Sequence, residues 1–208
     1  MSSPSTLKWI DLWNQRVHSY IGLFLLLFVW VYAFSGLVLN HPKWQFSNFW
    51  PQRQESASES VVRIPSAPTD LAKAQDLMGQ LGLSGEIDQI TAKPDHFDFR
   101  VGKPGQIVNV AVDLASAKAS VKRIRVNTWG VLNSLHHLTG VHADNPALTR
   151  NGVATSIWSF ALDATCVGML LLVTGGLWIW CRRKDSLLPG FIALVLGLLC
   201  CGCFVFAL

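Results

Sequence analysis

Residues 21–40 read IGLFLLLFVWVYAFSGLVLN, an almost unbroken apolar run with His18 before it and His41 after it. A helix needs about 20 apolar residues to cross the roughly 30 Å hydrocarbon core of a bilayer. The run therefore predicts a transmembrane helix over residues 21–41. At a rise of about 1.5 Å per residue, about 35 Å of helix would separate the two imidazoles. We expect them at opposite membrane faces, where they cannot share a ligand within one subunit.

The composition is that of a small membrane protein. Half of the 208 residues are hydrophobic and only 14% are charged. Two further apolar segments, residues 157–181 and 187–208, are long enough to span a bilayer. The first run is too long and begins too late for a signal peptide, and it lacks a small-residue cleavage site. We therefore expect an α-helical integral membrane protein with three transmembrane helices.

Basic residues in the short flanks predict the orientation. Lys8 and Arg16 precede the first span, and Arg182, Arg183 and Lys184 follow the second. Positive charge in short loops stays cytoplasmic, whereas long domains cross largely regardless of charge. We expect a cytoplasmic N-terminus (1–20), a cytoplasmic loop (182–186), and residues 42–156 outside. The net charge of +4 is explained by this topology, so it is no evidence for a nucleic-acid partner.

The exterior segment predicts a small α+β domain on a linker. Residues 42–68 are expected to be a linker, because residues 51–68 are polar, proline-bearing and non-periodic. In the domain, residues 69–126, an apolar stripe predicts a helix over 69–81 that Thr69 or Asp70 caps and Gly82 ends. Alternating apolar residues predict strands that form a three- or four-stranded antiparallel meander, over 86–92, 96–101, 107–113 and 120–126.

Two other clusters suggest metal ligands at first sight. Asp95, His96 and Asp98 lie close together in sequence, but the alternation puts His96 on the solvent face of a hairpin. The cysteines all fall within the predicted spans, and three of them follow one another at 200, 201 and 203. Because these three fan around a helix, ordinary packing or lipid-facing thiols are the favoured interpretation.

A membrane-surface helix and loop are expected over residues 127–156. Helical spacing puts His136 on the apolar face of this helix and His137 on the opposite, polar face. The apolar face also carries Trp129, Leu132 and Leu135. The loop that follows the helix carries His142, which becomes a ligand candidate if the helix is one residue out of register.

His41 and His136 are the candidate ligand pair. His41 ends the first span on the outer side, with Pro42 terminating the helix, and His136 faces inward at the same layer. Two facing imidazoles are a standard axial pair for haem iron. A zinc site is the competing metal hypothesis, but it normally needs three or four ligands, and the nearest carboxylate is Asp144. The alternative without a metal is that both histidines have a structural role.

Asp163 lies about two turns into the second predicted span. An ionisable residue there is costly and usually faces the bundle interior or a functional site. One interpretation is a hydrogen-bonded helix contact, to Ser35 or Thr174. The other is a second-shell partner that orients a ligand imidazole or a haem propionate.

Several short segments together resemble the PepSY-associated transmembrane protein family. They are RVHSYIGL (16–23), SGLVLNH (35–41), LHH (135–137), WSFALDA (158–164) and TGGLW (174–178), in the family's order. The helix-plus-sheet domain between the first two spans looks PepSY-like. The resemblance covers most of the chain, which would be a short, three-helix form of the family.

The resemblance implies a haem-b protein of the bacterial inner membrane, similar to ferric-siderophore reductases of iron uptake. His18, His41 and His136 match the family's membrane-boundary histidines. No second histidine accompanies His18 on the inner side, so an inner haem would need a homodimer that supplies the other ligand. No flavin or nicotinamide motif is present, so electrons would come from quinol or a partner protein. The rival hypothesis is a non-enzymatic membrane accessory protein whose PepSY-like domain binds a periplasmic partner.

Overall fold

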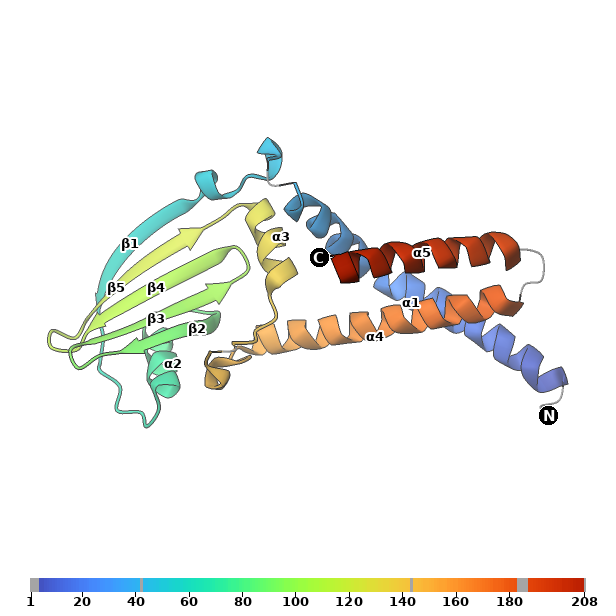
Figure 1. Ribbon diagram of the computed structural model, residues 1–208. Coiled ribbons are helices and arrows are strands. Elements are labelled where there is room, and N and C mark those ends of the chain that lie inside the picture. Colours follow the sequence, from blue (N-terminus) through green and yellow to red (C-terminus); the bar gives the residue numbers. More distant parts are fainter. Residues whose placement is uncertain (1–3, 42, 143, 183–186, 208) are drawn as a thin grey trace. The chain divides into compact units, whose positions relative to one another are not determined.

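The computed structural model describes residues 4–41, 43–142, 144–182 and 187–207 of the chain (Figure 1). The chain divides into two compact units. We call Met1–Val29 with Ala164–Leu208 the helical unit, and Trp30–Asp163 the sheet unit. Pro42 and residues 183–186, which include Arg183 and Lys184, lie outside the described residues. The predicted end of the first helix at Pro42 and most of the predicted cytoplasmic loop (182–186) are therefore outside the described residues.

Three helices are long and apolar enough to cross a membrane, as predicted. They are α1 (Pro4–Leu39), α4 (Val153–Arg182) and α5 (Leu187–Ala207). The helix α1 begins well before the expected start at residue 21, because no glycine or proline interrupts residues 5–20. At about 1.5 Å per residue it is about 54 Å long, which exceeds the hydrocarbon thickness of a bilayer. The candidate span accordingly begins at Leu7, ahead of the predicted start.

In the helical unit, α1 and α4 pack through glycines. Leu25 is only 2% exposed, and a Cβ added at Gly168 would lie 2.5 Å from its Cδ1. At the N-terminal end of α1, Asp11 accepts hydrogen bonds from Trp178 Nε1 at 2.9 Å and from Arg182 Nη2 at 3.0 Å. The start of α1 and the end of α4 therefore lie side by side within this unit.

The sheet unit contains a five-stranded antiparallel sheet in the order β1-β5-β4-β3-β2. Consecutive hairpins join β2 (Glu86–Ala92), β3 (His96–Lys103), β4 (Gln106–Asp113) and β5 (Lys118–Arg125). The helix α2 (Asp70–Gln80) lies against one face of this sheet (Figure 1). Apolar side chains of α2 and of the strand faces form the core: Val62, Ala74, Leu77, Ile87, Phe97, Phe99, Val101, Val108, Val110, Val112, Ala119, Val121 and Leu148.

The linker prediction is wrong for residues 54–61, which form the edge strand β1 (Gln54–Val61) beside β5. The predicted meander has three or four strands, whereas the sheet has five, because β1 was not predicted. Every residue of β1 is exposed, and its sequence QESASESV has no apolar face. Backbone pairing therefore holds the strand, with Glu55 in ion pairs to Lys122 at 2.9 Å and Arg53 at 2.7 Å.

The local signals for α2 are confirmed. The Thr69 hydroxyl caps the helix by accepting from the Ala72 N–H at 3.2 Å. Gly82 has a φ of +61°, the left-handed conformation that commonly follows a helix end.

The segments that connect the sheet to the apolar helices contain short ordered elements. Two 3-10 turns, η1 (Gln45–Ser47) and η2 (Trp50–Gln52), follow α1. The helix α3 (Thr128–His137) begins at the cap Asn127. The loop after it contains a third turn, η3 (Pro146–Leu148), which inserts Leu148 into the core.

Candidate functional site

His136, near the C-terminal end of α3, contacts α1 at Ser35. Its Nδ1 atom lies 2.7 Å from Ser35 Oγ, and Ser35 Oγ donates to the Tyr32 carbonyl at 3.0 Å. A serine hydroxyl has one proton. When that proton is donated to the Tyr32 carbonyl, Ser35 Oγ can accept from a His136 Nδ1–H, and the lone pair is then on Nε2, the form of imidazole that binds a metal ion.

The surroundings of His136 fit a close approach of α3 to α1. Ser35 is only 2% exposed. A Cβ added at Gly36 would lie 3.5 Å from His136 Cε1, and the Tyr32 and His136 ring centroids are 5.4 Å apart. His136 is half-buried whereas His137 is exposed, in agreement with the predicted helical phase.

His41 follows the last turn of α1 and is exposed. Its Nδ1 lies 2.8 Å from the Leu37 carbonyl oxygen. A carbonyl oxygen only accepts, so Nδ1 carries the proton and the lone pair is again on Nε2. The ring stacks on Trp44, with centroids 4.3 Å apart.

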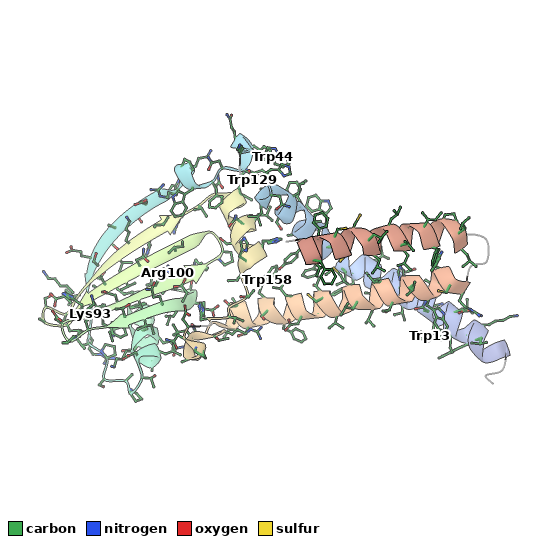
Figure 2. All side chains as sticks on the ribbon, viewed as in Figure 1. Trp13, Trp44, Lys93, Arg100, Trp129 and Trp158 are labelled. Carbon is green, nitrogen blue, oxygen red and sulfur yellow. The ribbon has the colours of Figure 1, made fainter. Side chains whose placement is uncertain are left out.

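Among the described residues, the ring contacts of His41 and His136 are with other partners. His41 stacks on Trp44, whose ring is 5.3 Å from Phe46, and Phe46 is 5.1 Å from Trp129 of α3. His136 packs against Tyr32 and His137, with ring centroids 5.4 Å apart in both pairs. Trp44 and Trp129 are labelled in Figure 2. That His41 and His136 form a ligand pair in one layer stays a prediction.

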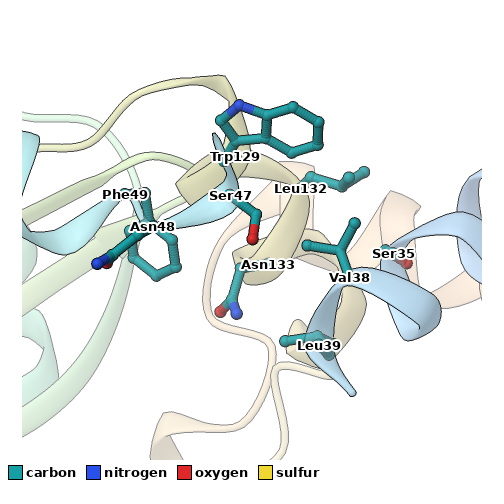
Figure 3. Close-up of a pocket in the computed structure, with 9 residues that line it drawn as sticks. All are labelled: Ser35, Val38, Leu39, Ser47, Asn48, Phe49, Trp129, Leu132 and Asn133. Carbon is teal, nitrogen blue, oxygen red and sulfur yellow. The ribbon is translucent and has the colours of Figure 1, made fainter. Parts of the chain in front are cut away.

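A cavity of about 150 Å³ lies between the end of α1, the segment after it and α3 (Figure 3). Its lining consists of Ser35, Val38, Leu39, Ser47, Asn48, Phe49, Trp129, Leu132 and Asn133. Pockets that enclose organic ligands usually measure about 300–1,000 Å³. The two imidazoles therefore fit haem iron by donor chemistry, whereas this cavity is too small to enclose the macrocycle.

His18 lies in the helical unit, against a pair of glycines in α4. Its Cε1 is 3.5 Å from the position of a Cβ on Gly176, and its buried Nδ1 has no hydrogen-bond partner in the part of the chain that the structure describes. One turn earlier, Asn14 donates to the Gly175 carbonyl at 3.0 Å. His18 is the one histidine in the sequence of this unit, so the unit supplies no imidazole partner for it.

His142 contacts Glu86, a residue that the sequence did not single out. His142 Nε2 lies 3.6 Å from Glu86 Oε1. Glu86 is only 4% exposed. Its neighbours in sequence predict a strand start, where a glutamate is normally exposed, so no local signal marks its burial. His142 therefore lies beside the buried first residue of β2.

Asp163 is exposed in the described chain. Its predicted partners are engaged elsewhere. Ser35 bonds to Tyr32 and His136, and Thr174 donates to the carbonyls of Leu170 and Leu171. A hydropathy window detects a span but does not tell which side of the helix an acid occupies. The role of Asp163 toward a haem propionate remains a prediction.

No group of three or more His, Cys, Asp or Glu side chains among the described residues is placed to hold a metal ion. Comparison with protein-family models, with curated proteins and with solved structures found no match to this chain. Function is therefore inferred from the residues themselves.

Proposed function

We propose that this chain is a haem-b electron-transfer protein of a bacterial inner membrane, with the sheet unit in the periplasm and His136 as a haem ligand. Its substrate would be ferric iron, most suitably as a ferric-siderophore complex. Two lines of support converge: three helices with the length and composition of membrane spans, and the resemblance to PepSY-associated membrane proteins.

The observation that carries the proposal is the hydrogen bond between Ser35 and His136. It orients the ring and is compatible with a proton on Nδ1, as the outer partners of metal-binding histidines usually are. His41 is prepared in the same way by the Leu37 carbonyl. The haem would supply one-electron redox chemistry, with a potential set by its axial ligands and its burial.

Reduction is a chemically sensible way to release iron from a chelator. Ferric iron is bound tightly by hard oxygen ligands, and reduction to Fe(II) weakens that binding. The electron donor would be quinol in the bilayer or a partner protein. A homodimer would bring a second His18 to the inner face, where one chain supplies a single imidazole.

The proposed topology has both the N-terminus and the end of α4 in the cytoplasm. Asp11 and Arg182 support it, because their ion pair joins these two helix ends within the helical unit. Lys8, Arg16 and Arg182 then lie on the side where positive charge is retained.

A second candidate function is a non-enzymatic membrane accessory protein, in which the histidines are structural. The separate hydrogen-bond partners of His41 and His136, the Leu37 carbonyl and the Ser35 hydroxyl, favour it. So does the small size of the neighbouring cavity.

An optical spectrum of the detergent-purified chain separates the two functions. If the protein binds haem, the oxidised sample shows a Soret band, and dithionite produces the α and β bands of a reduced b-type haem. A ferric-chelate reduction assay on the same sample then tests electron transfer. A purified chain without visible absorption, even after incubation with hemin, would leave the accessory function as the better account.

A further inference from the structure

Glu86, the first residue of β2, is a buried carboxylate without hydrogen bonds. Its side chain is 5% exposed, and neither Oε1 nor Oε2 has a hydrogen-bond partner within the described chain. The loop after α3 covers it through two glycines. A Cβ on Gly140 would lie 3.3 Å from Glu86 Oε1, and one on Gly152 would lie 3.6 Å from Glu86 Cβ. Buried charges in proteins are normally paired or bound to a metal, so we expect a cation beside this carboxylate.

His142 offers a second donor atom at the same place. Its Nε2 is also buried, has no hydrogen-bond partner among the described residues, and lies 3.6 Å from Glu86 Oε1, too far for a hydrogen bond. Hydrogen bonds hold the parts of the covering loop at residues 140 and 150–151. The Arg150 N–H donates to the Gly140 carbonyl at 2.8 Å, and the Asn151 side chain bonds to both the N–H and the carbonyl of Ile87.

The spacing of the two donors matches a shared metal ion. An oxygen and a nitrogen that each lie about 2.0–2.1 Å from a tetrahedral Zn²⁺ are roughly 3.3 Å apart. Both atoms belong to residues that line a cavity of about 240 Å³. The other charged side chains of this lining are engaged: Lys103 Nζ donates to Ser84 Oγ at 3.2 Å, and Asp88 pairs with Arg100 at 2.7 Å.

We propose that Glu86 and His142 bind a divalent transition-metal ion, with Zn²⁺ as the ion that suits a carboxylate and an imidazole best. Because the described residues offer no third donor here, water or a small ligand completes the coordination. This site is independent of the proposed haem function and removes His142 from the haem-ligand candidates. The binding is weaker than at a closed four-ligand structural site.

Zinc titration of the full chain tests this site. The protein is purified in detergent without a histidine tag, stripped with EDTA, and titrated with ZnCl₂ by calorimetry. We expect one Zn²⁺ per wild-type chain and at least about a tenfold loss of affinity in Glu86→Gln and in His142→Ala. His137→Ala is the matched control, because His137 lines the same cavity but is exposed. We expect this variant to bind zinc with the affinity of the wild type.

Two further measurements cover a variant that does not fold and separate the zinc site from the proposed haem site. If Glu86→Gln does not fold, a zinc-dependent rise in the melting temperature of the wild type, absent in His142→Ala, carries the test. His142→Ala leaves any haem spectrum unchanged, so loss of this site and loss of the haem are distinguishable. The proposal is overturned if the wild type takes up no zinc, which would leave an ion pair only, or if all variants bind it equally.

Discussion

At the scale of single residues, Ser35 decides how His136 is presented. Its hydroxyl contacts both the Tyr32 carbonyl and the imidazole, so one buried serine sets the direction of the ring. In an apolar run a serine is easily taken for a neutral helix residue. Its importance comes from α3, which is distant in sequence and lies against it in the fold.

Ser35→Ala should weaken haem binding without removing a ligand. The substitution deletes the acceptor for His136 Nδ1–H, and loss of such a partner typically costs about 10- to 100-fold in metal affinity. Hemin titration of the purified protein measures the effect. Ser134→Ala is the control on α3, because that hydroxyl bonds only to the Gly130 carbonyl of its own helix at 2.8 Å. Equal affinity in both variants would show that Ser35 does not position His136.

At the scale of elements, α3 depends on the glycine in its first turn. A Cβ on Gly130 would lie 2.6 Å from Val126 Cβ and 2.8 Å from Phe49 Cδ2. Gly130→Ala should therefore destabilise the sheet unit by about 1–3 kcal/mol, the usual cost of overpacking. Chemical unfolding followed by tryptophan fluorescence measures it.

Gly79→Ala in α2 is the matched control. Apart from the adjacent backbone of its own helix, no atom of the described residues lies within 4 Å of the added methyl group, so the substitution should stabilise the chain by about 0.4–1 kcal/mol. If Gly130→Ala is equally stabilising, α3 does not pack against the segment after α1 as described.

The edge strand β1 should respond to pH through Glu55. The hydrogen bond from Lys122, and then that from Arg53, holds the pKa of Glu55 below its ordinary value of 4.5. A carboxyl whose pKa is lowered by folding adds stability above its ordinary pKa and loses it as the pH falls through the lowered value. Glu55→Gln should therefore have a lower melting temperature than the wild type near neutral pH, and the difference should vanish well below pH 4.5. A difference that persists in acid would mean that charge is not its cause.

Much of the sheet unit could be predicted because its side chains alternate. Phe97, Phe99 and Val101 face the core from β3, and the strand β2 has the predicted bounds of 86–92. The strand β1 could not be found in this way, because all its residues are exposed and its partner β5 is distant in sequence. Apolar side chains alternate along a strand only where one face of the strand is buried. An edge strand without a buried face therefore lacks this pattern.

The candidate site shows the same division. Helical spacing separated His136 from His137, since that needs only the geometry of one helix. The neighbours of His41, the exposure of Asp163 and the burial of Glu86 depend on the packing of distant segments. Glu86 in particular is covered by a loop around Gly140 and Gly152, which no local pattern in β2 encodes.

At the scale of the whole molecule, the topology can be tested by labelling single cysteines. In a background without the native cysteines, Ser58→Cys in β1 should react with a membrane-impermeant maleimide added to intact spheroplasts. Ser186→Cys, which follows α4 in the sequence, should react only after the membrane is permeabilised. This result is expected because Lys8, Arg16 and Arg182 retain their flanks in the cytoplasm. Labelling of position 186 from outside would reverse the orientation.

The central claim is that His136 is a ligand to haem iron at the outer end of α1. The most direct test is the reduced-minus-oxidised spectrum of the purified full chain, recorded for the wild type, His136→Ala and His137→Ala at equal protein concentration. The wild type and His137→Ala should show the same b-type haem bands, because His137 is exposed. His136→Ala should insert normally but lose these bands, since an iron with one axial bond is weakly held. A His136→Ala protein whose haem spectrum equals that of the wild type would contradict the claim.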